Sequence, residues 1–327
     1  MRGESYGSAV GAMMAKSNLH AYYRRIEERR TDAKDEETKR YGENRFLGIN
    51  IAPNTETLDN APYLAESDFE QCSREMMEYS DYLVLNLAGT KLEGALLFES
   101  ENKLRELIRK VKKARTLEIG YQTAYDYEKS TILKNRVVEQ TSLENNTFHS
   151  VYNHYEKNNP TVIRRTPLLM IKVDASESKT QLAKYAKVAL EEGLDGIVVG
   201  SHLESTSGKN LIAGGRFTRN SALEALKLIY QTTQGKLTLI SSGGVFDARD
   251  VVDRMKNGAS VVQIYSSFML YVKLNLSFLL SNFSQGPEIV PNILEDLSQT
   301  VKKELAANNL KNLNQLIGSK VVLKETK

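Results

Sequence analysis

Glycine and hydroxyl residues follow two neighbouring apolar segments in the second half of the sequence. The segment 237–241 leads into Gly243 and Gly244, and the segment 260–264 leads into Tyr-Ser-Ser, with a helix-like stretch between them. Strand, turn, helix and strand in this order are typical of a parallel βαβ unit. Glycines leave backbone N–H groups uncovered at a strand end, and the next helix adds a positive dipole, so a phosphate can bind there. The alternative is that the two glycines only form a tight turn.

Amide, ammonium and hydroxyl side chains occupy the same place in other apolar segments. Asn50, Asn86, Lys172 and Ser201 each lie at or near the end of such a segment. In a barrel of alternating strands and helices, functional residues belong at the carboxyl ends of the strands. Amides, a lysine and glycine turns that converge on one face are typical of a flavin or nucleotide site.

Six apolar segments of strand length position these residues, and most of them are separated by a helical pattern. This alternation of strands and helices predicts an α/β fold of the TIM type. The (β/α) barrel is expected to be incomplete, because it has about six of the eight strands. Periodicity alone also allows an open, doubly wound sheet. The expected strands are 46–51, 82–87, 167–173, 196–201, 237–242 and 260–265.

The barrel pattern divides the chain into three parts and one insertion. Residues 1–45 form a charged N-terminal segment with helical character, residues 46–285 hold the barrel pattern, and residues 286–327 form a C-terminal helix and tail. Residues 117–165 hold no clear period and are rich in Tyr, Asn, Glu and Lys. A compact domain rarely carries so long an irregular connection. We interpret this insertion either as a tolerated surface segment or as a partner-binding segment.

Composition argues against several functional classes. The 327 residues are 41% hydrophobic, and 44 basic residues against 41 acidic ones give a net charge of +3, which predicts no nucleic-acid partner. Cys72 is the single cysteine, so no intramolecular disulfide can form, and its helical spacing from apolar neighbours predicts a core position. Four scattered histidines and one cysteine do not make a zinc-binding pattern.

Neither the first residues nor the most apolar window predicts a membrane-crossing segment. The first 30 residues contain no long apolar run, which argues against a secretory signal. Their small and basic residues fit mitochondrial targeting weakly, and an ordinary exposed segment is the simpler interpretation. The window 261–280 is interrupted by Lys273 and begins inside the last expected strand, so we interpret it as a strand and a buried helix.

Several short stretches, taken at their spacing, carry a resemblance to a known family. They are GLDGIVV, SSGGV and NGASVVQIYSSF, supported by FLGIN, YLVLNL and MIKV. With these stretches the chain resembles the dihydroorotate dehydrogenases, most closely the membrane-associated, quinone-using class 2 enzymes, over about residues 46–285 except the insertion. The resemblance implies a TIM barrel that carries FMN and oxidises dihydroorotate to orotate in pyrimidine biosynthesis. It also implies a mitochondrial location at the inner membrane, with only indirect membrane contact.

The resemblance implies FMN as the cofactor, and most residues of the implied flavin site are present. The changes elsewhere in the family pattern leave open whether this chain has kept FMN or lost it. The implied site has two asparagines near the flavin ring, a lysine beside the ring that helps to hold charge there, a paired-glycine loop and two phosphate-binding turns. In that order, the matching residues are Asn50 and Asn86, Lys172, Gly215, then Gly243 and Gly244 with Tyr265 and Ser266.

The substrate side of the family pattern is altered. The family motif after the second strand runs Asn-x-Ser-Ser-Pro-Asn, and its second serine is the base that removes a proton from dihydroorotate. This chain has Gly89 at the base position and Lys91 where the last asparagine would hold the substrate. A missing general base typically lowers a rate by about 10² to 10⁴. Thr90 and His202 are the nearest alternative proton acceptors, and we expect neither to replace the serine, because a base must reach the proton directly.

The family barrel also begins with two strands that this sequence does not show. Six strands of eight cannot close a barrel, and open sheet edges expose unpaired backbone groups. We hypothesise that another polypeptide covers these edges within a multi-subunit assembly.

Three functions are compatible with these observations. The first is a divergent dihydroorotate dehydrogenase-like protein with impaired catalysis that acts as an accessory or structural subunit of a larger mitochondrial assembly. The second is an active FMN-dependent enzyme, with the family reaction or another oxidation. The third is a flavin-binding module without catalysis. The lost base favours the first and the third, because function is argued from the site and not from the fold.

Overall fold

The computed structural model describes most of the barrel region and the last helix. The described residues are 2–4, 14–15, 17–19, 21–22, 25, 46–89, 91–92, 95–115, 167–200, 203–206, 209–213, 218–264 and 289–323. The insertion 117–165 therefore lies outside the described residues.

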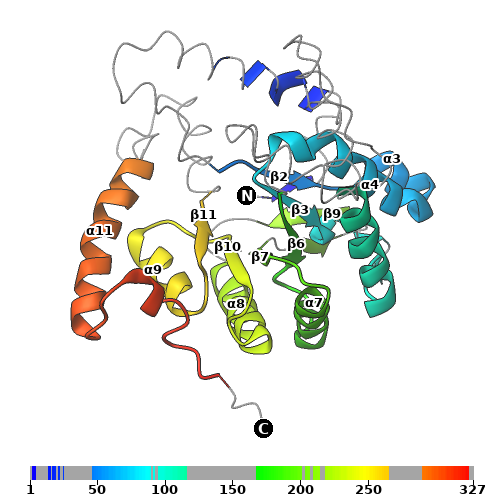
Figure 1. Cartoon of the computed structure of the whole chain (residues 1–327). Coiled ribbons are helices and arrows are strands. Elements are labelled where there is room, and N and C mark those ends of the chain that lie inside the picture. The colour runs from blue at the N-terminus through cyan, green and yellow to red at the C-terminus, as the bar shows by residue number, and fades with distance from the viewer. Residues whose placement is uncertain are drawn as a thin grey trace, which may run out of the picture.

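Six parallel strands form the main sheet, as the sequence predicts. Their spatial order is β11-β10-β7-β6-β3-β2, which is also their order along the chain. A doubly wound sheet would reverse its strand order at a switch point, so the sequential order supports the barrel type. Figure 1 shows the sheet as an open half-barrel with α7, α8 and α9 along its outer side. The strands are β2 (Gly48–Ile51), β3 (Tyr82–Asn86), β6 (Leu168–Asp174), β7 (Gly196–Gly200), β10 (Thr238–Ser242) and β11 (Val261–Gln263).

Amphipathic helices connect the strands. The main ones are α4 (Ala65–Met76), α7 (Lys179–Glu191), α8 (Arg219–Thr233), α9 (Ala248–Lys256) and a helical run at 101–115. Ser178 caps α7 by accepting a hydrogen bond from the amide of Gln181 (3.1 Å), which satisfies a donor that a helix start leaves unpaired. Other helical elements are α3 (Thr55–Asn60), η1 (Pro62–Leu64), η2 (Met77–Tyr79), η3 (Leu87–Gly89), α11 (Ile289–Ala307) and η6 (Leu313–Gln315).

Short antiparallel pairs also occur, and the sequence pattern did not predict them. β8 (Leu203–Thr206) and β9 (Lys209–Ala213) form a hairpin between β7 and α8, and β1 (Arg2–Glu4) pairs with β9. A second pair joins β4 (Lys91–Leu92) to β5 (Ala95–Leu96). These strands are too short to carry a period in hydrophobicity.

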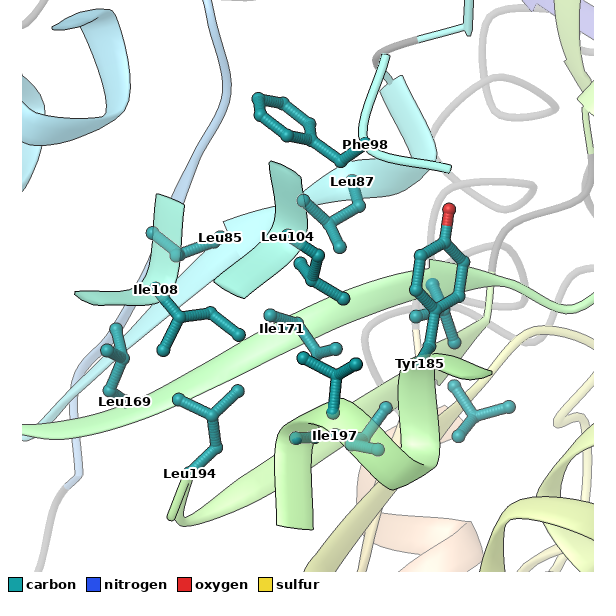
Figure 2. Close-up of a cluster of buried hydrophobic side chains, with 14 of the residues drawn as sticks. Leu85, Leu87, Phe98, Leu104, Ile108, Leu169, Ile171, Tyr185, Leu194 and Ile197 are labelled. Atoms are coloured by element: carbon teal, nitrogen blue, oxygen red, sulfur yellow. The ribbon is translucent and has the colours of Figure 1, made fainter. Parts of the chain in front are cut away.

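Alternation of side chains along the strands creates two apolar layers. The outer layer packs between the sheet and the helices, where Leu85 and Ile171 meet Leu104 and Ile108 of the helical run 101–115, and Tyr185 of α7 joins them (Figure 2). The inner layer lies on the concave face of the sheet. It consists of Val84, Met170, Val198 and Ile240, with Tyr82 packed against them.

Cys72 packs against the outer layer, as its spacing predicts, although it is half-buried and not fully enclosed. Burial raises the pKa of its thiol, and the carboxylates of Asp68 and Glu75 act in the same direction. Among the described residues, no cluster of His, Cys, Asp or Glu is arranged to hold a metal ion. No described helix is both long enough and apolar enough to cross a bilayer.

Tyr230 of α8 packs between the last βα unit, which is β10 with α9, and the C-terminal segment, residues 308–323. Its ring lies where a Cβ atom on Gly258 or Gly318 would approach within 2.4 or 2.3 Å, so both positions must lack a side chain. The amide of Gly318 donates to the carbonyl of Met255 (2.9 Å), and the amide of Lys320 donates to that of Lys256 (3.0 Å). The C-terminal segment thereby fixes the end of α9 just before β11 begins.

This packing predicts different costs for alanine at two glycines of positive φ. Gly193 and Gly258 both have positive φ, at 62° and 111°, but a Cβ on Gly193 meets only the Lys112 ammonium at 3.6 Å. Gly193→Ala is expected to lower the free energy of unfolding by about 1–2 kcal/mol, the cost of a left-handed backbone for alanine. Gly258→Ala adds a collision with Tyr230 and a φ that alanine tolerates less than the left-handed one, so we expect about 2–5 kcal/mol in total. Urea denaturation of both variants measures the difference, and equal losses would contradict the role of Tyr230.

Candidate functional site

The carboxyl ends of the parallel strands bring two predicted site residues side by side. Val84 and Met170 belong to the inner apolar layer, and two residues further along the same strands come Asn86 and Lys172. In the β3–β6 pairing, Asn86 lies directly opposite Lys172. Because side chains alternate with a period of two, both project from the concave face at the end where a barrel binds its ligands.

Asn86 carries an unsatisfied polar atom. Its side chain is half-buried, and its Oδ1 atom is buried without a hydrogen-bond partner among the described residues. Leaving a buried acceptor unpaired costs about 1–3 kcal/mol, so such an atom calls for an explanation. At the carboxyl end of a barrel strand, a donor on a bound ligand provides one.

Lys172 places a cation at the same end of the sheet. Burial lowers the pKa of its ammonium group, and the carboxylate of Asp174 acts in the opposite direction. Asp174 is itself held in place, because its Oδ1 atom accepts hydrogen bonds from the amide (2.8 Å) and hydroxyl (2.7 Å) of Ser176. A partly desolvated cation on a concave face can stabilise negative charge on a bound group.

Asn50 lies on the same face but one row away. It pairs with Val84 in the β2–β3 register, so it does not stand directly beside Asn86. Its side chain is exposed on the edge strand β2. The structure therefore brings Asn86 and Lys172 together closely and places Asn50 at the margin of the same surface.

Gly243 and Gly244 form a turn that packs on the start of α8. Their φ angles are 93° and 70°, in the region that favours glycine. A Cβ on Gly244 would lie 2.8 Å from the backbone of Arg219, and one on Gly243 would lie 3.0 Å from the hydroxyl of Thr218. Backbone angles and packing together thus favour glycine at both positions, in agreement with the tight-turn interpretation.

The same turn keeps its amide groups available, which agrees with the phosphate interpretation. No hydrogen bond joins the amide N–H of Gly243 or Gly244 to another described residue. Unpaired amides at a glycine turn form an anion-binding concavity. The two interpretations are therefore compatible, since the packing shapes the turn and the turn leaves donors for a ligand.

The structure does not describe the other predicted flavin contacts, which are Gly215, Tyr265 and Ser266. Ser201 and the two alternative proton acceptors, Thr90 and His202, also lie outside the described residues. Gly89 is described. It ends the 3₁₀ turn η3 (Leu87–Gly89), which follows β3 directly, so it lies at the same end of the sheet as Asn86. Lys91 begins the short strand β4 beyond it.

The described part of the site fits the flavin nucleotide that the sequence implies. A buried amide oxygen without a partner, a desolvated lysine and a glycine turn with unpaired amides are the groups that a polar ring system and its phosphate require. Sequence reasoning missed one contributor, the arginine Arg254 of α9, which contacts the glycine turn from below. A charged residue in an amphipathic helix ordinarily indicates a solvent-facing position, so no local signal marked it.

Comparison with known proteins identifies the family of the chain. The family model described as dihydroorotate dehydrogenase matches residues 16–276. A mitochondrial dihydroorotate dehydrogenase (quinone) from Arabidopsis thaliana is 23% identical over 291 residues, which cover 84% of this chain and 48% of the relative. A bacterial dihydroorotate dehydrogenase (quinone) from a Nocardioides species is 26% identical over 234 residues, which cover 68% of this chain and 54% of the relative. The chain thus spans about half the length of these curated relatives.

A solved structure shows the same fold. The dihydroorotate dehydrogenase of Eimeria tenella, crystallised with ferulenol, superposes with a TM-score of 0.63 at 20% identity, covering 97% of this chain and 70% of that one. Its similarity agrees with the half-barrel seen here. The family match over most of the chain, together with this fold, shows that the chain is a divergent member of the dihydroorotate dehydrogenase family.

Proposed function

We propose that this protein binds FMN, that its oxidation of dihydroorotate is impaired, and that it serves as an accessory subunit of a larger assembly. The observation that carries the proposal is Gly89. It ends the turn η3 at the carboxyl end of β3, where the family motif supplies the proton acceptor, and it has no side chain.

Among the described residues, the neighbours of Gly89 in its turn provide no replacement. Leu87 and Ala88 complete the turn with buried apolar side chains. A general base must come within about 2.6–3.2 Å of the proton that it removes, or act through one water molecule. Proton removal from dihydroorotate therefore lacks its acceptor at this position, and the expected rate loss is about 10² to 10⁴.

The flavin-binding side is better preserved. Asn86 and Lys172 would hold the ring, with Asn50 at its margin, and the turn at Gly243 and Gly244 would hold the phosphate. FMN, when bound, supplies an acceptor for a hydride and so makes oxidation of a C–H bond feasible. Lys172 contributes positive charge beside the ring, and Asn86 contributes an acceptor for a ring donor.

A second candidate is an active FMN-dependent dihydroorotate dehydrogenase that uses a quinone. The register that pairs Asn86 with Lys172 favours it, because both residues occupy the positions that the resemblance assigns to the flavin ring. The two candidates differ in one respect, namely whether dihydroorotate can transfer electrons to the bound flavin. A mitochondrial location suits either candidate and is supported by relatives described as mitochondrial in Arabidopsis thaliana and Mus musculus.

The accessory role rests on the sheet edges. Among the described residues, β2 and β11 each pair with one neighbour only, so each presents backbone groups on its other side. Exposed edges of this kind recruit further strands. We propose that a second polypeptide covers these edges and links this chain to the assembly.

Anaerobic titration with dihydroorotate tests the impaired reaction. We expect the visible flavin band of the purified protein to persist, because Gly89 cannot accept the proton. The variant Gly89→Ser/Lys91→Asn restores both family residues and should speed bleaching by at least about tenfold over the matched Gly89→Ala/Lys91→Asn variant. Rapid bleaching in the unmodified protein would establish the second candidate. Absence of any flavin band would refute flavin binding and leave only the accessory role.

Lys172→Met separates flavin binding from folding. Methionine keeps the packing of the stem but removes the desolvated charge, so the free energy of unfolding should stay constant or rise. The dissociation constant for FMN should rise by about tenfold, because the charge interaction with the flavin is lost. The control Lys184→Met alters a lysine on α7 that contacts Gln181. Fluorescence titration and urea denaturation measure both quantities, and equal FMN affinity in the two variants would count against the site.

Photo-crosslinking tests the covered edges. Phe46, just before β2, is 82% exposed, and Val261 on β11 is 48% exposed. Benzoylphenylalanine at either position should capture the same second polypeptide in cells of the organism that makes this protein. As a control, benzoylphenylalanine at Val322, which is 80% exposed in the C-terminal segment, should not capture it. Capture of no protein at Phe46 and Val261, or of equal products at all three positions, would contradict a partner at the edges.

A further inference from the structure

We propose that Arg254 is a positioning residue that aims the Gly243–Gly244 turn at the phosphate of a flavin nucleotide. The inference rests on the proposed flavin-binding function and extends it to a residue that does not touch the ligand. Arg254 belongs to α9 and is fully buried beneath the turn.

One guanidinium group joins three segments of the chain at this point. Nη1 of Arg254 donates to the hydroxyl of Ser241 at 2.8 Å, within β10. Nη2 donates to the carbonyl of Gly243 at 2.6 Å and to the carbonyl of Arg219 at 3.3 Å. The strand end, the glycine turn and the first residue of α8 are thereby held by a single planar group.

The contact to Gly243 fixes the direction of the next amide. The carbonyl of Gly243 and the N–H of Gly244 belong to one planar peptide unit and point in opposite directions. Because Arg254 binds the carbonyl, the N–H of Gly244 is directed away from Arg254. That amide has no hydrogen bond to another described residue, so it remains a donor for a ligand.

The reverse orientation would repel an anion. If the peptide unit flipped, the carbonyl oxygen would take the place of the amide and present negative charge to a phosphate. A glycine turn permits such a flip, because glycine adopts both signs of φ with little cost. Arg254 opposes the flip by giving the carbonyl a charged donor, which forms a stronger hydrogen bond than a neutral one.

Two carboxylates on α9 hold the rest of the arrangement. Asp250 is buried, and its Oδ2 atom accepts a hydrogen bond from the amide of Phe246 at 2.8 Å, which shapes the loop after the turn. Its Oδ1 atom lies 2.8 Å from Nε of Arg219, and Asp253 accepts a hydrogen bond from the same side chain at 3.1 Å. Arg219 is thus fixed to α9 while its backbone carbonyl receives Arg254.

A buried guanidinium group lowers the free energy of unfolding relative to an apolar side chain of similar volume. Burial lowers the pKa of Arg254 to about 10, and its Nε atom is buried without a hydrogen-bond partner among the described residues. Apolar residues of similar volume often stabilise a core as well as a buried charge or better. A requirement for a fixed peptide orientation explains why this position keeps its charge.

The preference for FMN over riboflavin, which lacks the phosphate, measures the effect directly. The ratio of the two dissociation constants isolates the phosphate, so a general loss of stability cancels from it. For the full chain stripped of flavin, we expect FMN to bind at least about 30-fold more tightly than riboflavin. Arg254→Lys should reduce this ratio by at least about tenfold, because one ammonium group cannot bind all three partners, while the riboflavin constant changes little.

A matched control lies on the same helix. Lys256 is a second largely buried cation of α9, but it pairs with Glu304 of α11 and faces away from the turn. Lys256→Met should therefore leave the FMN to riboflavin ratio unchanged. Ser241→Ala removes one partner of Arg254 in a variant that keeps the guanidinium, and it should lower the ratio by about threefold even if Arg254→Lys does not fold.

The outcomes separate this inference from the proposed function. Binding of neither flavin by the unmodified protein would refute the flavin proposal and the inference with it. Tight binding of both flavins with equal affinity would keep flavin binding but show that the turn does not hold the phosphate. A clear preference for FMN that survives both Arg254→Lys and Ser241→Ala, or Ser241→Ala alone where Arg254→Lys does not fold, would show that Arg254 is only structural.

Discussion

The register between parallel strands is the constraint on which the whole site depends. Side chains alternate between the faces of a strand, so a slip of one residue between β3 and β6 would move Asn86 or Lys172 to the helix-covered side. The two apolar layers prevent the slip. Leu85 and Ile171 fill the space under the helices, and Val84 and Met170 fill the concave side. The polar residues of the site are therefore positioned by hydrophobic packing that they do not contribute to.

Those polar residues reduce the stability that the same fold would otherwise have. Lys172 is partly desolvated, Asn86 keeps a buried oxygen unpaired, and Arg254 is a guanidinium enclosed by protein. Each of these costs free energy, and an apolar residue of matching volume would avoid it. Residues of this kind concentrate at functional sites, where stability is exchanged for binding or orientation. Their placement at one end of one sheet supports a retained ligand site.

The strands and most helices were predictable, because their hydrophobic periods extend over whole elements. The alternation of strands and helices predicted a parallel sheet but left a doubly wound order open, and the sequential strand order of the structure decides for the barrel type. The hairpin β8–β9 was not predictable, since a strand such as Leu203–Thr206 is too short and polar to show a period. Arg254 was missed for a different reason. Its burial arises from partners 13 and 35 positions away in the sequence, Ser241 and Arg219, and charge at a helix position says nothing about such contacts.

The residues proposed to hold a flavin and the position of the family's proton acceptor lie in different parts of this architecture, so one can change without the other. The residues that would hold the flavin belong to strands and to a turn whose backbone positions are set by the core. The proton acceptor of the family motif belongs to a turn after β3. Gly89 occupies that position, while Leu87 and Ala88 beside it remain buried and keep the turn in place. Chemistry can disappear there at almost no structural cost. The fold consequently shows the family, whereas activity has to be argued from side chains at positions such as 89, which the fold does not constrain.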